Sequence, residues 1–284
     1  MFKIAKFPVR SQIVREISRM VKNFSVHICP ILDDNYSYFI VDLNTNKVAV
    51  VDPAEPPKVV DYFLKLQNEY QNKLQLQQVL TTHKHWDHAG GNIEMAKKFP
   101  GIEIVGSTYE AVDGVNKKVS EKTTFKIGNT NVKVLFTPCH TKGHVQYLLE
   151  DEQNKEYALF SGDTLFIAGC GRFFEGDAEQ MWNNFIQLKQ LDPSTKLYCG
   201  HEYTQSNIKF AKSVDPDNKD LQDMSAKVDE LRSNKKPTIP TTLGQEFSFN
   251  PFLRSDDPTL QKKMNTSDPV STLHALRKAK DNFK

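Results

Sequence analysis

Residues 82–88 read T-H-K-H-W-D-H, and this segment constrains the fold more than any other part of the chain. The apolar run at 79–81 before it has the character of a strand, so His83 and His85 lie two residues apart on extended chain and point the same way. The aspartate and the third histidine fall in the next turn, where they can face a second ion. Structural histidines are the alternative, but imidazole and carboxylate groups this crowded repel one another or lose hydration unless a cation holds them. The segment therefore predicts a metal site at the end of a strand.

Two metal sites need more ligands than this segment supplies, so other segments must contribute. Three later candidates each follow an expected strand and stand near Gly or Pro: His140 in T-P-C-H-T-K-G-H, Asp163 in S-G-D-T and His201 in Y-C-G-H-E-Y. Taken singly, each would more often be a loop or capping residue, and Asp163 also fits a helix N-cap or a turn. Together they predict loops that meet at one edge of a sheet and carry function. His144 fits a supporting position near His140.

Short strands and helices alternate up to about residue 203, and helical patterns follow. Apolar and β-branched runs predict strands at 26–32, 38–41, 47–51, 79–81, 102–105, 132–136, 145–149, 158–160 and 196–198. Amphipathic periodicity predicts helices at 59–66, 92–99, 178–191, 207–214, 221–233 and 269–282. We therefore expect a mixed α/β domain over 26–203 and a small helical domain over 204–284.

Composition narrows the class of protein. The chain has 284 residues, of which 38% are hydrophobic and 25% charged, enough for one sizeable core or two modest ones. Its mean hydropathy is −0.54, and no uncharged apolar run approaches the roughly 18 residues of a membrane-spanning helix. The four cysteines form no C-x-x-C pair, which excludes a zinc ribbon and a thioredoxin-like redox pair. We expect them to be free thiols packed in the interior.

The first 25 residues differ from the rest of the chain. Residues 1–24 carry six basic residues and one acidic residue, although the net charge of the whole chain is only +2. Apolar residues from Ile13 to Phe24 recur at helical spacing with basic residues on the other face, which predicts a basic amphipathic helix. This composition is typical of a mitochondrial transit peptide and lacks the apolar core of a secretory signal, while a surface helix or a tail is the alternative. We therefore expect a mitochondrial or cytoplasmic protein that is not secreted.

A series of motifs in this order and spacing resembles the glyoxalase II (hydroxyacylglutathione hydrolase) family of the metallo-β-lactamase superfamily. The motifs are D-N-Y-S-Y, V-D-P, T-T-H-K-H-W-D-H-A-G-G-N, T-P-C-H-T-K-G-H, F-S-G-D-T-L-F, A-G-C-G-R-F-F-E-G, Y-C-G-H-E-Y-T and F-N-P-F-L-R. The resemblance covers the chain from about residue 26 to its end. It implies an α/β fold of the four-layer αββα metallo-β-lactamase type, followed by a small C-terminal α-helical domain that binds the substrate.

The resemblance also implies a ligand set and a reaction. By matching motif, one metal ion would be held by His83, His85 and His140, a second by Asp87, His88 and His201, and both would be bridged by Asp163. The ions would be two divalent cations, zinc or, with the same ligands, iron or manganese. The implied reaction is the second step of methylglyoxal detoxification, in which a metal-bound hydroxide hydrolyses S-D-lactoylglutathione and related 2-hydroxyacylglutathione thioesters to D-lactate and glutathione. A thiolate leaves with little help because the pKa of its conjugate acid is only about 8.5.

Five further residues match substrate-binding positions of the family. Arg277 and Lys280 share a helix face that would otherwise be interpreted as a solvated surface, and the resemblance implies that they contact a carboxylate of glutathione. Arg172 and Tyr203 match further substrate positions. Two departures stand out: Arg172 replaces a frequent Lys, and Phe174 replaces a frequent Tyr, so one hydroxyl hydrogen bond to the substrate is expected to be missing.

Other functions fit the sequence less well. A glutathione persulfide dioxygenase of this superfamily uses one iron ion, and the retention of all seven ligand candidates disfavours it. A nuclease is disfavoured because the residues after position 24 include 31 basic and 34 acidic residues, without a long basic stripe. A catalytically silent metal-binding protein is the alternative from another class. We expect a monomer that acts on a small molecule, without a nucleic-acid or membrane partner.

Overall fold

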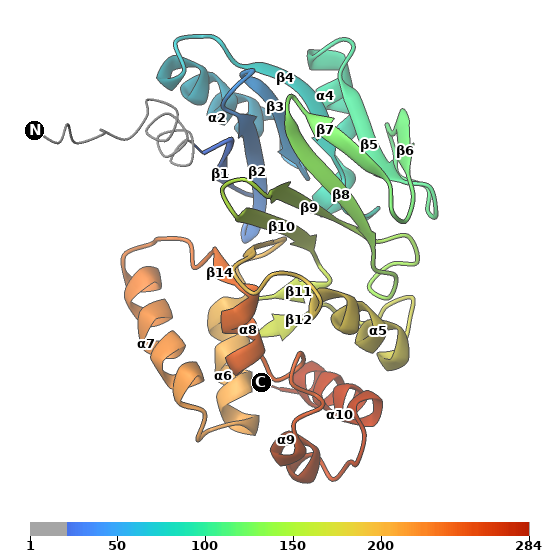
Figure 1. The fold of residues 1–284 in the computed structure, drawn as a ribbon, viewed down its shortest axis with the longest axis vertical. Coiled ribbons are helices and arrows are strands. Elements are labelled where there is room, and N and C mark those ends of the chain that lie inside the picture. The colour runs from blue at the N-terminus through green and yellow to red at the C-terminus, as the bar shows by residue number, and fades with distance from the viewer. Residues whose placement is uncertain (1–21, 284) are drawn as a thin grey trace, which may run out of the picture.

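The computed structural model describes residues 22–283, which form two six-stranded β-sheets stacked face to face (Figure 1). Helices cover the outer faces of both sheets, so the layers follow in the order helix, sheet, sheet, helix. Further helices follow in the C-terminal part. The fold is therefore the four-layer αββα sandwich with a C-terminal helical region that the sequence predicts.

The first sheet contains β1 (Phe24–Ile31), β2 (Asn35–Asp42), β3 (Lys47–Val51), β4 (Gln75–Leu80), β5 (Glu103–Ser107) and β6 (Lys117–Val119), in that order. The second sheet has the order β14-β13-β10-β9-β8-β7. Its strands are β7 (Thr124–Ile127), β8 (Thr130–Phe136), β9 (Val145–Asp151), β10 (Glu156–Gly162), β13 (Lys196–Cys199) and β14 (Thr241–Thr242). A small hairpin is formed by β11 (Leu165–Phe166) and β12 (Gly169–Cys170).

The helices fall into two groups. Those of the sandwich are α2 (Pro56–Glu69), α3 (Trp86–Ala89), α4 (Asn92–Lys98) and α5 (Ala178–Leu188). Those of the C-terminal region are α6 (Thr204–Val214), α7 (Lys219–Ser233), α8 (Leu243–Phe249), α9 (Pro258–Lys263) and α10 (Pro269–Asp281). None of the helices in residues 22–283 combines the length and apolar character needed to cross a bilayer.

The apolar core follows the layers. Tyr38, Tyr147 and Phe160 are fully buried between the two sheets. On the outer faces, Met95 of α4 packs over the first sheet and Phe185 of α5 over the second. The cluster between the sheets continues into α6, α7 and α8. The C-terminal helices therefore share the core of the sandwich, and all four cysteines are buried and free, as expected.

Parallel strand pairs bring several strand ends to the same place. In the first sheet β3 runs parallel to β4, and Val51 pairs with Leu80. In the second sheet β10 runs parallel to β13, and Gly162 pairs with Cys199. Because parallel strands end at the same edge, the residues that follow these four ends lie close together. The segments that begin at residues 52, 81, 163 and 200 therefore meet at one edge of the sandwich.

Several elements differ from the sequence-based expectation. The strands β6, β7, β11, β12 and β14 were not expected, nor were α3, α8 and α9. Strand β14 pairs with β13, so the C-terminal region contributes a strand as well as the expected helices. The expected leader helix lies almost entirely outside the described residues. Phe24, which we placed on the apolar face of that helix, instead begins β1, pairs with Asp42 and is buried in the core.

Candidate metal centre

The structure brings together all seven side chains that the sequence singled out as metal ligands. They come from the segment after β4, from α3, from the β8–β9 loop and from the segments after β10 and β13. Three groups of ligand atoms lie within 4.8 Å of one another: His83, His85 and His140; His83, His88 and Asp163; and Asp87, His88 and His201. The first and third groups are the two sets of ligands that the family resemblance implies.

Asp163 lies between these two sets. Its Oδ2 is 3.4 Å from Nε2 of both His140 and His201, and its Oδ1 is 3.3 Å from Nε2 of His88. That Oδ1 is buried and has no hydrogen-bond partner among residues 22–283. A buried carboxylate oxygen without a partner is costly, and a cation removes the cost. Together with the imidazole and carboxylate donors, this oxygen fits a divalent metal centre.

Outer hydrogen bonds determine which nitrogen of each imidazole faces the centre. Nδ1 of His88 lies 2.9 Å from Oδ2 of Asp52, and Nδ1 of His201 lies 2.9 Å from Oδ1 of Asp34. An ionised carboxylate only accepts hydrogen bonds, so both Nδ1 atoms carry the proton. The Nε2 lone pairs of these two histidines therefore point into the centre.

In two more histidines, Nδ1 also carries the proton and Nε2 faces the centre. Nδ1 of His140 donates to the carbonyl oxygen of Arg172 at 3.0 Å. Nδ1 of His83 lies 3.1 Å from the Thr82 hydroxyl, which donates to Asp52 and must therefore accept from His83. Four imidazole lone pairs thus converge on one small volume, and a cation satisfies them together.

The electrostatics of the centre also favour positive charge. Burial lowers the pKa of His83 well below its ordinary value, and the neighbouring His88 adds to this effect. Burial lowers the pKa of His88 as well, but Asp163 and Asp52 outweigh burial and raise it to about 9. Burial raises the pKa of Asp163, whereas His88 and His201 more than offset this and lower it below its usual range. The carboxylates therefore attract positive charge to the position where a divalent ion would supply it.

His144 lies behind the centre and supports it. Its Nε2 accepts a hydrogen bond from the N–H of Asp163 at 3.1 Å, and its ring stacks on His83 at 4.9 Å. Its ring also meets that of His140 edge to face at 6.2 Å, so it packs near His140 as expected and supports Asp163 and His83 as well. Gly162 has a φ of +48°, and a Cβ there would lie 2.7 Å from Nε2 of His144, so the close approach requires glycine.

Sequence reasoning assigned no role to Asp34 and Asp52. Both stand in motifs that carry the family resemblance, D-N-Y-S-Y and V-D-P. Asp52 directly follows β3, just as Asp163 directly follows β10. This shared position after a strand was the available signal, since it places an acidic side chain at the same sheet edge as the histidines.

A cavity of about 580 Å³ opens over the centre. Its wall includes all five residues predicted to bind substrate, namely Arg172, Phe174, Tyr203, Arg277 and Lys280. Tyr203 stacks on His201 at 4.5 Å with an interplanar angle of 5°, and the ring of Phe174 lies 5.2 Å from that of His140. The cavity has the size of a small-molecule site and joins the metal-ligand candidates to α10.

The two cations of α10 that line the cavity, Arg277 and Lys280, differ in their contacts. Arg277 is buried, donates from Nη1 to the carbonyl oxygen of Cys170 at 2.8 Å, and is paired with Asp281 through Nη2 at 2.9 Å. Among residues 22–283, Lys280 donates only to Ser206, at 2.9 Å to Oγ and 3.0 Å to the carbonyl oxygen. Burial, with Arg277 nearby, lowers the pKa of Lys280 to about 8. Lys280 thus keeps one N–H donor for a ligand. Arg277 uses three of its five N–H donors to hold Asp281 and tie α10 to β12, which leaves two donors in the cavity wall.

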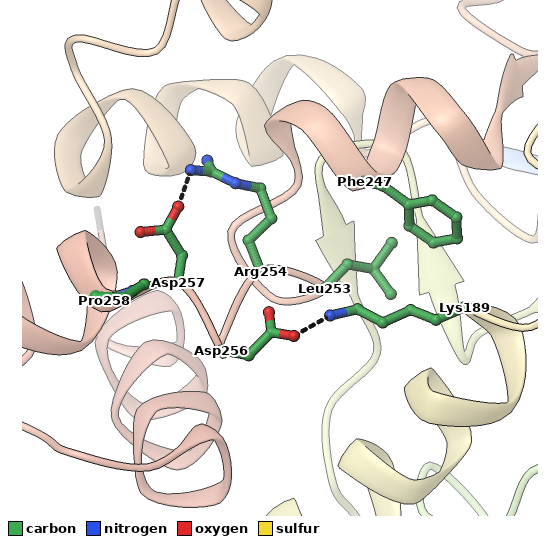
Figure 2. A pocket seen from close by; sticks show the side chains of 7 residues that line it. All are labelled: Lys189, Phe247, Leu253, Arg254, Asp256, Asp257 and Pro258. Atoms are coloured by element: carbon green, nitrogen blue, oxygen red, sulfur yellow. Dashed lines mark hydrogen bonds and ion pairs between the residues drawn. The ribbon is translucent and has the colours of Figure 1, made fainter.

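A second hollow, of about 550 Å³, lies between α5 and the segment after α8 (Figure 2). Its charged side chains are already paired: Lys189 with Asp256 at 2.5 Å, and Arg254 with Asp257. No histidine is among the seven residues that line it. This hollow therefore offers neither an imidazole nor an unpaired charged side chain to a ligand.

Comparison with known proteins agrees with this architecture. Residues 31–201 match the metallo-beta-lactamase superfamily, and residues 202–283 match the family described as hydroxyacylglutathione hydrolase C-terminus. The chain is 43% identical over 257 residues to the cytoplasmic hydroxyacylglutathione hydrolase of Arabidopsis thaliana, covering 90% of this chain and 97% of that one. The chain belongs to the hydroxyacylglutathione hydrolase family. Like the rest of this family, also called glyoxalase II, it is a thioester hydrolase.

More distant hydroxyacylglutathione hydrolases match over nearly the whole chain as well. The enzyme of Synechococcus sp. is 41% identical over 256 residues, which cover 89% of this chain and 98% of that one. Among solved structures, ETHE1 from Myxococcus xanthus superposes with a TM-score of 0.60 at 24% identity, covering 90% of this chain and 97% of that one. This last likeness concerns the metallo-β-lactamase fold alone.

Proposed function

We propose that this chain hydrolyses S-D-lactoylglutathione and related 2-hydroxyacylglutathione thioesters to D-lactate and glutathione. The observation that carries the proposal is one cavity that joins the candidate ligands to the cationic end of α10. A thioester of glutathione has a reacting carbonyl at one end and carboxylates at the other, which suits this arrangement. Membership of the hydroxyacylglutathione hydrolase family supports the same substrate class.

We further propose the following distribution of ligands. Metal 1 would be held by His83, His85 and His140, metal 2 by Asp87, His88 and His201, and Asp163 would contact both. When bound, two divalent ions would supply hydroxide at neutral pH, by lowering the pKa of water from about 15.7 towards 7, and would polarise the thioester carbonyl. Zinc is our proposal for both ions, with iron and manganese as the alternatives that these donors suit.

The rest of the mechanism rests on side chains that bind and orient the substrate. Lys280 would take a carboxylate of glutathione, since its ammonium group has a donor left. Arg172 is exposed in the same wall, where its Nε pairs with Asp281 at 3.3 Å. Phe174 and Tyr203 give the thioester an apolar surface beside the ligand candidates. The glutathione thiolate leaves without a general acid, because the pKa of a thiol is about 8.5.

In this proposal the two parts of the chain have different roles. Residues 26–203 provide the metal ligands, and residues 204–284 provide the cations of α10. We propose that the enzyme acts as a monomer on a small molecule and works in the mitochondrial matrix or the cytoplasm. A fluorescent reporter fused to residues 1–25 distinguishes the compartments, since import requires mitochondrial fluorescence and a diffuse signal contradicts it.

The decisive experiment is an absorbance assay for loss of S-D-lactoylglutathione by purified protein, before and after chelator treatment. We expect turnover that disappears with the chelator and returns with Zn²⁺, together with two ions bound per chain by elemental analysis. Metal-loaded protein without turnover would support the silent metal-binding alternative. One iron ion per chain would instead support the dioxygenase alternative.

A further inference from the structure

The three candidate ligands of metal 1 come from two loops that are distant in sequence. The first loop runs from β4 to α3 and carries His83 and His85, and the second runs from β8 to β9 and carries His140. The bases of the loops are joined by a backbone hydrogen bond from the N–H of Val145 to the carbonyl oxygen of Thr82 at 2.9 Å. The imidazoles are attached at the tips of the two loops, and a further contact is needed to fix the distance between these tips.

Glu110 provides that link from a third loop, which follows β5. Its Oε1 accepts a hydrogen bond from the N–H of Lys84 at 2.9 Å, and its Oε2 accepts one from the N–H of Gly143 at 3.2 Å. Lys84 stands between the two histidines of the first loop, and Gly143 lies three residues after His140 in the second. One carboxylate therefore spans both loops, with one oxygen for each.

The packing at Gly143 indicates that this contact is built into the fold. A Cβ at Gly143 would lie 2.3 Å from Cγ and 2.8 Å from Cδ of Glu110. Such distances are too short for any side chain, so glycine lets the glutamate lie directly against the loop backbone. The ring of Tyr109, the preceding residue, packs at a tilt on the ring of Phe136, with the centroids 4.2 Å apart, and holds the third loop against the end of β8.

Glu175 forms a second bridge between the same loops. Its Oε1 accepts from Nζ of Lys84 at 2.6 Å, and its Oε2 accepts from the N–H of Lys142 at 2.8 Å. Glu175 is the residue after Phe174, which lines the substrate cavity, so a substitution of Glu175 would also disturb that wall. Glu110 lies outside that cavity wall and outside every motif that carries the family resemblance, so a substitution there does not disturb the substrate side.

We propose that Glu110 is a positioning residue whose carboxylate sets the separation of the two loops and thereby the affinity for metal 1. This inference rests on the proposed function, because it assumes the ion that His83, His85 and His140 would hold. Removing one outer contact of a metal site costs about 10–100-fold in affinity. Metal 2 receives its outer support from Asp52 and Asp34 instead, so Glu110 acts on one of the two ions.

The test measures Zn²⁺ affinity by competition with a chromophoric chelator in two backgrounds that isolate the sites. His201→Ala weakens metal 2 and leaves the metal 1 ligands, whereas His140→Ala does the reverse. Adding Glu110→Gln keeps the size of the side chain, but its amide nitrogen cannot accept a backbone N–H. We expect the Zn²⁺ dissociation constant to rise about 10–100-fold in the His201→Ala background and to change less than about threefold in the His140→Ala background.

Two further variants test whether the effect is specific to the contact made by Glu110. Gly143→Ala should push the glutamate off the loop and produce the same selective loss, with Glu110 itself unchanged. Glu121→Gln is the matched control, because this glutamate is 52% exposed and its Oε1 lies 4.0 Å from Nζ of the neighbouring Lys122. We expect it to leave both dissociation constants as they were, and thermal unfolding of the metal-free proteins identifies any variant that fails to fold.

The outcomes separate this inference from the proposed function. Two ions per wild-type chain, with equal losses in both backgrounds or no loss in either, overturn the role of Glu110 alone. Fewer than two ions bound by the wild type overturns the two-metal proposal and this inference with it. A selective loss that Glu110→Asp partly restores supports the positioning role.

Discussion

Asp52 and His88 form a fully buried pair in which Oδ2 of the aspartate lies 2.9 Å from Nδ1 of the imidazole. The same carboxylate accepts hydrogen bonds from the N–H and the hydroxyl of Thr82 at 2.8 and 2.7 Å. It therefore fixes the start of the T-H-K-H segment and the ring of His88 together. Asp52, directly after β3, thereby orients Thr82 after β4 and His88 in α3.

Asp52→Asn should weaken metal binding while keeping the size of the buried side chain. The amide nitrogen would face the N–H of His88, so the imidazole would shift its proton to Nε2 and turn a donor hydrogen towards the centre. We expect the affinity for one of two Zn²⁺ ions to fall about 10–100-fold, measured by chelator competition. Asp61→Asn, on the exposed side of α2, is the control and should change nothing. Equal affinities in Asp52→Asn and the wild type would contradict the supporting role.

Lys280→Ala should raise the KM for the glutathione thioester about 10–150-fold, since a hydrogen bond to a charged group contributes about 1.5–3 kcal/mol. We expect kcat to change little, because the lysine binds the end of the substrate away from the reacting carbonyl. Initial rates over a range of substrate concentrations separate the two constants. Lys278→Ala on the exposed side of the same helix serves as the control, and an unchanged KM in Lys280→Ala would exclude the anchor.

The same lysine predicts a pH dependence of KM. Burial and the neighbouring Arg277 lower the pKa of Lys280 to about 8, so the free enzyme loses this charge as the pH rises through that value. We expect KM for the thioester to increase above about pH 8 in the wild type. Lys280→Arg should remove the increase, because a guanidinium stays charged throughout. Parallel KM profiles for the two proteins between pH 7 and 9 would assign the titration to another group.

Phe174→Tyr should improve substrate binding. The ring of Phe174 is 58% exposed in the cavity wall beside His140, and a hydroxyl on it can reach the peptide part of glutathione. A net hydrogen bond contributes about 1 kcal/mol, so KM should fall roughly fivefold with kcat unchanged. Phe173→Tyr is the comparison, since Phe173 packs against the core and lies outside this wall. A higher KM in Phe174→Tyr would show that the apolar ring itself is required.

Glu246 predicts how the stability of the protein depends on pH. It is fully buried, it accepts hydrogen bonds from Ala168, Thr241 and Asn250, and burial raises its pKa to about 7. The unfolded chain releases this proton near pH 4.5. The protonated folded state therefore contributes stability below that pH, and the contribution is lost as the pH rises through about 7.

The matched variant is Glu246→Gln, which keeps the shape and does not ionise. Relative to it, the wild type should lose about 3 kcal/mol in the free energy of unfolding between pH 4.5 and 8. Urea unfolding of the metal-free proteins at several pH values measures the difference. A constant difference across that range would mean that Glu246 ionises at its ordinary pKa.

Most of the candidate ligands could be picked out from the sequence because they come soon after strands whose apolar pattern is local. His140, Asp163 and His201 could be identified from the few residues on either side, and parallel pairing then places two of them together. The supporting residues were harder to find. Glu110 and Asp34 lie in loops and Glu246 lies in a short helix, and each of them has a partner 26 to 167 positions away.

The helical region shows a second limit of local patterns. Strand β14 is two residues long, and α8 lies between prolines that normally interrupt helices. Both are stabilised by tertiary contacts: Thr241 pairs with Leu197, and Leu243 is buried in the core. Such elements cannot be distinguished from loops by periodicity. Arg277 was correctly placed in a helix, but its burial against Cys170 depends on a contact 107 positions away.

The shared core of the sandwich and the C-terminal helices restricts how substrate preference can evolve in this chain. An exchange of the segment after residue 203 with that of a relative would separate β13 from β14, break the bond between Glu246 and Ala168, and replace one side of a common apolar cluster. Recombination at this boundary would therefore damage folding before it altered specificity. Point substitutions at the exposed rim of the cavity, at positions such as 172, 174 and 280, are the route that leaves the fold intact.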